Sequence, residues 1–355
     1  MEAVFAQRLK SARVMQGFSM AELAARMGNR ISKQAIGKYE KGLAVPNSEN
    51  LIALARALSV KLDYFFRPEL ITVKLGPPVY RKRQHLSKKS LARIRETVQE
   101  QVERYLQVES LFPPQRFPAQ RLPDLVTRQV KSFADVEELA VKLRKTWNLG
   151  LDPIDNLVQT LEDRHVIVVL LPEIDHFDGL SCWANESIPV VVSKKTEAGD
   201  RLRFTVAHEL GHLLIDAQGI DEEKAAQRFA AAFLVPATVV RQELGESRRV
   251  ISGAELQQLK IKYGTSMQMW IYRARDLGII SESHAQEWFI AFRRIGHRQE
   301  PGAPIEPEEP MRFHKLVFQA LAEDLISESR ATEFLNWNID RIREKMLGDF
   351  HAVGA

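Results

Sequence analysis

The sequence from Phe204 to Ile215 reads Phe-Thr-Val-Ala-His-Glu-Leu-Gly-His-Leu-Leu-Ile, and it contains the pattern His-Glu-x-x-His. Its apolar residues recur at the spacing of one helical face, which predicts an amphipathic helix. On a helix, residues four apart project from the same side, about 6 Å apart along the axis. The imidazoles of His208 and His212 can therefore reach one metal ion.

This pair of histidines suits zinc. Zinc binds imidazole nitrogen at about 2.0–2.1 Å, and a catalytic zinc site uses three protein ligands and one water. Glu209 directly follows the first histidine, so we expect it beside the metal, where it can accept a proton from the bound water. The alternatives are two buried histidines in an ordinary amphipathic helix, or a zinc ion that only stabilises the fold.

A third ligand is expected from the segment that follows. Acids occupy positions 221–223 and open a second predicted helix, which Pro236 ends. Acids are favoured at the positive N-terminus of any helix, which explains them without a metal. A helix packed antiparallel to the first could nevertheless place one of these acids against both histidines.

Together the two segments resemble the ImmA/IrrE family of zinc metallopeptidases. The residues that carry the resemblance are Arg203-Phe-Thr-Val-Ala-His-Glu-Leu-Gly-His-Leu-Leu and then Glu223-x-x-Ala-x-x-Phe-Ala-Ala-x-x-Leu-x-Pro236. They lie within about residues 165–240. The resemblance implies a zincin-like domain with a Zn2+ cofactor, held by His208, His212 and Glu223, and with Glu209 as the catalytic base. The family often has Glu-Ala-Asn where this chain has Ala-Ala-Gln at 225–227, and this leaves Glu222 as an alternative third ligand.

The N-terminal region has a different pattern. Residues 4–16 are predicted to form an amphipathic helix, and Ser19 with Glu22 forms the capping box of a second, shorter one. Ser32 is placed to cap a third helix at 33–40, which exposes Lys and Gln. A short helix, a tight turn and a second helix with such residues are typical of a helix-turn-helix.

Residues 4–66 closely resemble the phage-repressor-like (XRE) DNA-binding domain, on the motifs Gly-Phe-Ser-x-x-Glu-Leu-Ala, Ser-Lys-Gln-Ala-Ile and Tyr-Glu-Lys-Gly-x-x-x-Pro. By that family's pattern, Lys33, Gln34 and Lys38 face duplex DNA. Gln suits adenine, and Lys suits guanine or phosphate. The alternative is a solvated helix face, and some such domains bind protein or dimerise instead.

The distribution of charge agrees with a polyanion partner at one end of the chain. Residues 1–150 carry 27 Lys and Arg against 14 Asp and Glu, whereas the remainder carries 23 against 32. A basic half beside an acidic half favours nucleic acid as the partner of the basic half. A solvated basic surface is the alternative.

These patterns divide the chain into four parts. We expect a helix-turn-helix domain at 1–67, a basic connector with a long helix at 68–131, and a zinc peptidase domain at 132–297. A Pro-rich linker and a C-terminal helical module, which packs or supports a homodimer, fill 298–355. The predicted fold class is mainly α with a small β-sheet, that is α+β. Tyr263, Tyr272 and Arg273 are candidates for stabilising an oxyanion.

The cellular setting is predicted from what the sequence contains. One cysteine, Cys182, cannot form an internal disulfide and fits a reducing cytoplasm. The N-terminus has no apolar core segment typical of a signal peptide. No run approaches the ~20 apolar residues of a membrane span. We therefore expect a cytoplasmic protein without a membrane partner.

The sequence favours a DNA-binding zinc endopeptidase. The resemblance implies limited cleavage of a repressor or antitoxin-like protein, encoded by a neighbouring gene, in a prophage, stress-response or toxin–antitoxin setting. The rival interpretation is a non-enzymatic XRE-type regulator or toxin–antitoxin component in which zinc is structural. An intact Glu209 favours the enzyme, because a purely structural zinc site does not need it.

Overall fold

The computed structural model describes residues 2–67, 71–77, 86–117, 128–295 and 300–347. The chain packs into two compact units. The first contains Met1–Leu75, Arg83–Arg116 and Leu316–Ala355, and the second contains Gly76–Lys82 and Phe117–Lys315. The described part is mainly α-helical with one two-stranded and one three-stranded sheet, so the predicted α+β class is confirmed. Residues 68–70, 78–85 and 118–127 of the predicted basic connector lie outside the described residues.

The helix-turn-helix forms the N-terminal part of the first unit. Its elements are α1 (Glu2–Met15), α2 (Met20–Arg26), α3 (Lys33–Glu40), α4 (Ser48–Leu58) and the 3-10 helix η1 (Leu62–Phe66). Ser19 and Glu22 form the predicted capping box, and Ser32 accepts a hydrogen bond from the amide of Ala35 at 3.2 Å. The core residues of these helices include Phe5, Leu9, Leu23, Ile36, Leu54 and Phe65.

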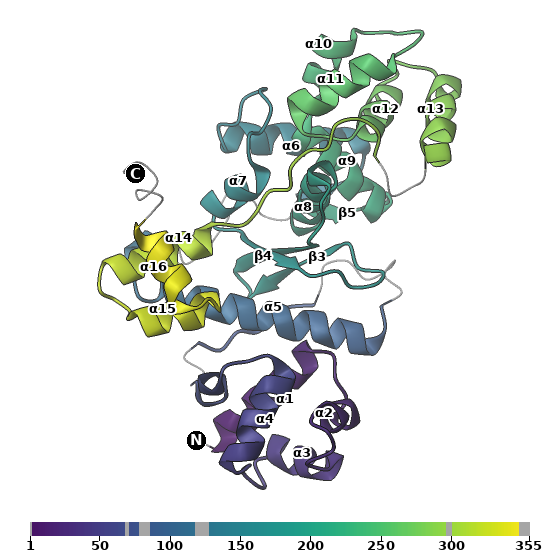
Figure 1. Ribbon diagram of the computed structural model, residues 1–355. Helices are drawn as coiled ribbons and strands as arrows, with labels where there is room; N and C mark the ends of the chain where they lie inside the picture. The colour runs from purple at the N-terminus through teal and green to yellow at the C-terminus, as the bar shows by residue number, and fades with distance from the viewer. Residues whose placement is uncertain (1, 68–70, 78–85, 118–127, 296–299, 348–355) are drawn as a thin grey trace, which may run out of the picture. The chain divides into compact units, whose positions relative to one another are not determined.

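Two further parts of the chain pack in the same unit. They are the long helix α5 (Lys88–Glu109) and the C-terminal helices α14 (Arg312–Ala322), α15 (Glu328–Leu335) and α16 (Ile339–Leu347). α14 belongs to this unit from Leu316 onwards. Within the unit, α3 lies on the side away from α5 (Figure 1).

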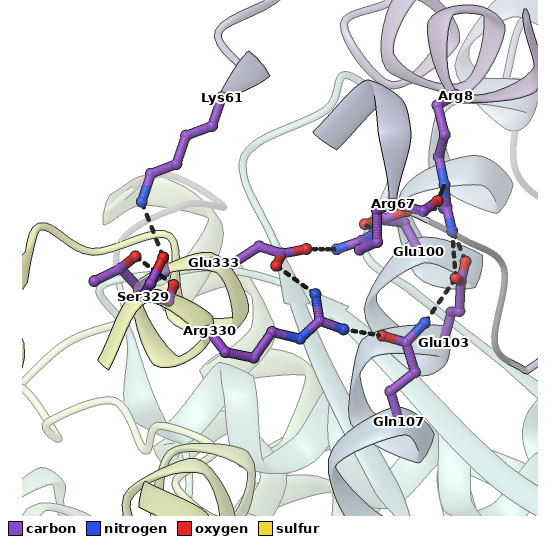
Figure 2. Close-up of polar contacts among 10 residues, drawn as sticks. Arg8, Lys61, Arg67, Glu100, Glu103, Gln107, Ser329, Arg330 and Glu333 are labelled. Atoms are coloured by element: carbon purple, nitrogen blue, oxygen red, sulfur yellow. Dashed lines mark hydrogen bonds and ion pairs between the residues drawn. The ribbon is translucent and has the colours of Figure 1, made fainter. Parts of the chain in front are cut away.

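Buried ion pairs connect these three parts of the first unit (Figure 2). Arg8 on α1 donates to Glu100 at 3.1 Å and to Glu103 at 2.5 Å, both on α5. Arg67, which follows η1, pairs with Glu100 and lies 3.6 Å from Glu333 on α15. Each of these two guanidinium groups therefore has a carboxylate partner on a distant segment, as buried charges require.

A second set of contacts holds α15 in the same network (Figure 2). Arg330 donates to Glu333 and, at 3.3 Å, to the side chain of Gln107 on α5. The ammonium group of Lys61 donates to the carbonyls of Thr332 and Trp337 at 3.2 and 3.3 Å. The C-terminal helices therefore contact both the helix-turn-helix and α5.

The second unit contains the small sheets. Strands β2 (Ile167–Leu171) and β4 (Ile188–Lys194) are parallel, and β3 (Gly179–Ala184) pairs antiparallel with β4 in the order β2-β4-β3. The sequence predicts strands at 166–171, 180–184 and 188–193, and each of these ranges agrees with its observed bounds to within one residue. Strand β1 (Arg128–Val130) pairs in parallel with β5 (Ile215–Ala217).

Helices make up the rest of the second unit. They are α6 (Phe133–Thr146), α7 (Leu157–Asp163), α8 (Gly199–Leu214), α9 (Glu222–Leu234), α10 (Ala237–Leu244), α11 (Gly253–Tyr263), α12 (Met267–Asp276) and α13 (Glu282–Ile295). One boundary differs from the prediction. Asp152-Pro153 has the residues of an N-cap and a first-turn proline, which predict a helix that starts at 153, but α7 begins at Leu157. Its N-cap is Asn156, whose side chain accepts a hydrogen bond from the amide of Gln159 at 2.7 Å.

The segment from Glu300 to Arg312, predicted as part of a Pro-rich linker, is bound along the second unit. We call it the C-terminal strap. Figure 1 shows it as an extended chain that passes the helices of this unit before α14 begins. Its backbone contributes to the first turn of α8, because the carbonyl of Ile305 accepts a hydrogen bond from the amide of Gly199 at 2.8 Å.

Among the described residues, no helix is both long enough and apolar enough to cross a membrane.

Candidate metal centre and nucleic-acid interface

The two histidines of the motif face each other on α8. Their Nε2 atoms are 3.1 Å apart, and the rings meet edge to face with centroids 4.7 Å apart. The i, i+4 spacing predicted this arrangement. His212 is 1% exposed in its side chain, whereas His208 retains partial access to solvent.

Glu223 lies in the first turn of α9 and faces both histidines. Its carboxylate oxygens are 3.5 Å from Nε2 of His208 and 3.6 Å from Nε2 of His212. The ligand atoms of the three residues all lie within 4.8 Å of one another. Glu222 instead lies 3.7 Å from Nδ1 of His212, and its side chain is 45% exposed.

Glu209 is buried beside this cluster, with 5% of its surface exposed. Burial raises its pKa to about 7, against the opposing effect of nearby His212. A β-carbon at Gly179, the first residue of β3, would lie 2.9 Å from the Glu209 carboxylate and 2.9 Å from Thr205. A glycine is therefore needed at this point, so that β3 can lie against the acid.

A second glycine lets the two helices of the cluster approach each other. A β-carbon at Gly211 would lie 3.0 Å from the Phe229 ring and 3.4 Å from the backbone of Ala226 on α9. Phe229 itself stacks on Phe233, with centroids 5.7 Å apart. Close packing of α8 on α9 sets the distance between the histidines and Glu223.

The predicted DNA-contacting residues share the exposed face of α3. Lys33, Gln34 and Lys38 are exposed, whereas Ile36 and Tyr39 are buried in the core of the helix-turn-helix. An exposed polar face on the second helix of the pair is the arrangement that base recognition in the major groove requires.

Comparison with known proteins adds to this geometry. Residues 9–65 match the family described as helix-turn-helix, and residues 162–275 match the IrrE N-terminal-like domain. The chain joins a helix-turn-helix domain to an IrrE N-terminal-like domain. The resemblances inferred from the sequence are thereby confirmed for both domains, and the second belongs to a metallopeptidase family.

One curated relative shares part of the sequence. The chain is similar to the SPbeta prophage-derived uncharacterized HTH-type transcriptional regulator YonR of Bacillus subtilis (strain 168), with 36% identity over 64 residues. The likeness covers 18% of this chain and 57% of the relative. The chain thus spans little more than half the length of this relative, and most of the chain lies outside the likeness.

The donor set of the IrrE N-terminal-like domain fits a zinc ion. Two imidazole nitrogens and one carboxylate are a ligand set that catalytic zinc sites use. Burial and neighbouring His212 lower the pKa of His208 to about 4, so its imidazole is neutral at pH 7, the form that binds metal. Among the described residues, one carboxylate oxygen of Glu209 is buried and has no hydrogen-bond partner.

The three oxyanion candidates are in varied surroundings. The hydroxyl of Tyr263 donates to Glu243 at 2.7 Å, and Arg273 is fully buried and pairs with Glu137. Tyr272 is half exposed and packs against Phe289, with ring centroids 4.4 Å apart. Two of the three therefore already have polar partners elsewhere in the domain.

Sequence reasoning missed several residues around the cluster. It assigned no role to Gly179 or Gly211, although a glycine at the start of a strand or inside a helix often marks a close approach. It also interpreted the C-terminal strap as a linker because of its prolines. The acids Glu306 and Glu308, which are two residues apart in that segment, were the available signal that it binds to the rest of the domain.

Proposed function

We propose that this chain is a DNA-binding zinc endopeptidase that makes limited cuts in a partner protein. The cluster of His208, His212 and Glu223, with buried Glu209 beside it, is the observation on which the proposal rests. A bound zinc ion would supply an activated water for attack on a peptide carbonyl. Glu209, with its pKa near neutrality, suits the transfer of a proton from that water to the leaving amine.

The helix-turn-helix supports the second part of the proposal, which is binding to duplex DNA. Lys33, Gln34 and Lys38 would contact base edges and phosphates from α3. Tethering a peptidase to DNA raises its local concentration near other DNA-bound proteins. A repressor or antitoxin-like protein encoded by a neighbouring gene is therefore the proposed substrate, in the cytoplasm of a cell with a prophage, stress-response or toxin–antitoxin system.

The decisive experiment incubates the zinc-loaded chain with the product of each flanking gene and analyses fragments by mass spectrometry. Glu209→Gln keeps the size of the side chain but cannot act as a base, so zinc should stay bound while cleavage falls by orders of magnitude. Zinc content is measured in parallel for Glu223→Ala and Glu222→Ala, and only the first should lose metal. Loss in Glu222→Ala alone would move the third ligand to that residue.

DNA binding has its own test. Fluorescence anisotropy on the gene's promoter region should show affinity that falls steeply with salt, because Lys and Arg displace counterions from phosphates. Gln34→Ala should cost about 1–3 kcal/mol on the correct operator if it contacts a base edge.

A non-enzymatic transcription regulator with a structural zinc is the second candidate, favoured by the description of the prophage relative as an HTH-type transcriptional regulator. It would be supported if operator binding is normal and no flanking product is cut by the zinc-loaded chain.

A further inference from the structure

The C-terminal strap, Glu300–Arg312, is bound to the second unit along most of its length. Besides the Ile305 contact with α8, it receives hydrogen bonds from α11, from α12 and from the amide of Val158 on α7, and it donates to Glu162 on α7. Glu309 of the strap adds an ion pair with Lys195, at 2.7 Å. An unattached linker would not place so many of its groups against one domain.

The strap supplies the cap that α8 lacks. The N-cap residue of α8, Ala198, makes no side-chain hydrogen bond to the helix, although the first amides of any helix need partners. The amide of Gly199 instead donates to Ile305 of the strap at 2.8 Å. A β-carbon at Gly199 would lie 2.2 Å from the carbonyl oxygen of Glu306, so the strap backbone lies directly against this turn.

A buried ion pair fixes the next turn. Arg203 pairs with Glu308 of the strap, and both side chains are less than a tenth exposed. The other carboxylate oxygen of Glu308 accepts a hydrogen bond from the amide of Val158 at 2.7 Å. Arg203 also donates to the carbonyl of Ile154 at 2.5 Å. Glu308 thus joins α8, α7 and the strap at one point.

A second buried pair strengthens the same end of α8. Asp200 lies 2.9 Å from the ammonium group of Lys260 on α11, and both residues are almost fully buried. Lys260 donates in addition to the carbonyl of Pro301 in the strap at 3.2 Å. The first five residues of α8 are therefore held by three separate contacts that involve the strap.

We propose that the strap positions the metal helix, with Glu308 as a positioning residue for the ligand His208. Arg203 precedes His208 by five residues, which is about 7.5 Å along a helix, so a change in the direction of α8 moves the histidines relative to Glu223 on α9. This role rests on the proposed metal centre. The positioning role would also give the strap a part in that centre, although the strap lies outside residues 162–275, the part of the chain that matches the IrrE N-terminal-like domain.

The test compares two neighbouring acids in the full-length chain. Glu308→Gln keeps the shape of the side chain but has one acceptor oxygen for two donors, Arg203 and the amide of Val158. Glu309→Gln is the control, because its pair with Lys195 is more than half exposed. Zn2+ affinity is measured by competition with a chelator, and Co2+ is used as a probe because its visible absorption reports coordination geometry.

Glu308→Gln should lower the Zn2+ affinity at least tenfold and alter the visible spectrum of the Co2+-saturated chain, while the far-UV circular dichroism stays unchanged. Glu309→Gln should match the wild type in all three measurements. A Glu308→Gln chain that melts earlier in the metal-free form, yet binds both ions as the wild type does, would overturn the positioning role. It would leave the proposed peptidase intact. A wild-type chain that binds no Zn2+ would instead overturn the proposed metal centre, and the positioning role with it.

A pair of glycines provides an independent variant. Gly199 and Gly253 are each the first residue of a helix, but a β-carbon at Gly253 would meet only a Trp288 side-chain atom at 3.5 Å. Gly199→Ala should displace the strap and lower the Zn2+ affinity more than Glu308→Gln does. Gly253→Ala should leave the Zn2+ affinity unchanged. Equal Zn2+ affinity in both variants would contradict the proposal. If Gly199→Ala does not fold, the isosteric Glu308→Gln decides.

Discussion

The two units place their candidate functional residues in opposite environments. On α3, Lys33, Gln34 and Lys38 are exposed, and the charges that hold the unit together lie in a separate buried network. In the second unit, His212 and Glu209 are themselves buried, and the helix that carries them is restricted by close glycine contacts. We therefore expect the proposed DNA-contacting surface to tolerate substitutions with little loss of stability, and the proposed metal cluster to tolerate few.

This difference has a physical origin. A DNA-contacting side chain must reach a partner outside the protein, so its own unit gains nothing from burying it. A metal ligand and its general base need a fixed geometry and restricted water, which burial provides. In the first unit, buried charges connect segments that are far apart in the sequence, whereas in the second unit the distance between two helices sets the geometry of the candidate site.

The largest effect is expected from Glu100→Ala in the first unit. Glu100 is the shared partner of Arg8 and Arg67, and removal of one partner from a buried ion pair typically costs about 3–5 kcal/mol. Hydrogen exchange followed by mass spectrometry should show lost protection in α1 and α5. Lys89→Ala removes an exposed pair with Glu22 and is the control, with little expected change. Equal protection in both variants would contradict the dependence on buried charge.

An intermediate effect is expected from Gly211→Ala in the second unit. The added methyl group would lie 3.0 Å from Phe229, and overpacking of this kind typically costs about 1–3 kcal/mol. Because α9 carries Glu223, its displacement should also weaken Zn2+ binding. Protection of α1 and α5 in the first unit should stay unchanged. If Zn2+ affinity is normal in this variant, the close approach of α8 and α9 does not set the ligand geometry.

Local signals in the sequence predicted much of both functional helices. The capping residues Ser19 and Ser32 placed α2 and α3, because a cap acts on amides only two or three residues away. The spacing of His208 and His212 predicted one shared face, because helical periodicity alone determines it. Which of Glu222 and Glu223 faces the histidines depends on how α9 is rotated about its own axis relative to α8. Packing between the helices sets this rotation, and no local pattern in the sequence indicates it.

Contacts between distant segments could not be predicted in this way. Arg8 and Glu100 are 92 residues apart, and nothing near either residue indicates the other. The same holds for the strap, where the prolines of residues 301–310 are as typical of a linker as of an extended segment bound to a domain. The start of α7 was misplaced because Asp152-Pro153 is a strong local signal, whereas the chain uses Asn156.

The smallest effect is expected where the C-terminal helices join the first unit. Glu333 on α15 contacts both Arg67 and Arg330, and its side chain is 20% exposed (Figure 2). Its surroundings are thus intermediate between the buried pairs on α5 and an exposed surface pair. Glu333→Gln should therefore cost about 1 kcal/mol, at the upper end of the ~0–1 kcal/mol typical of surface pairs and below the cost of breaking a buried one.

Glu328→Gln is the matched control on the same helix, because Glu328 pairs with Arg343 inside the C-terminal module and both side chains are largely exposed. Hydrogen exchange in α15 and α16 separates the two variants. Faster exchange in Glu333→Gln alone would show that α15 is held through Arg67, so that the end of the helix-turn-helix domain and the C-terminal helices stabilise each other. Equal exchange in the two variants would show that α15 is held by its apolar residues, such as Phe334 and Leu335, and that the polar contacts follow from that packing.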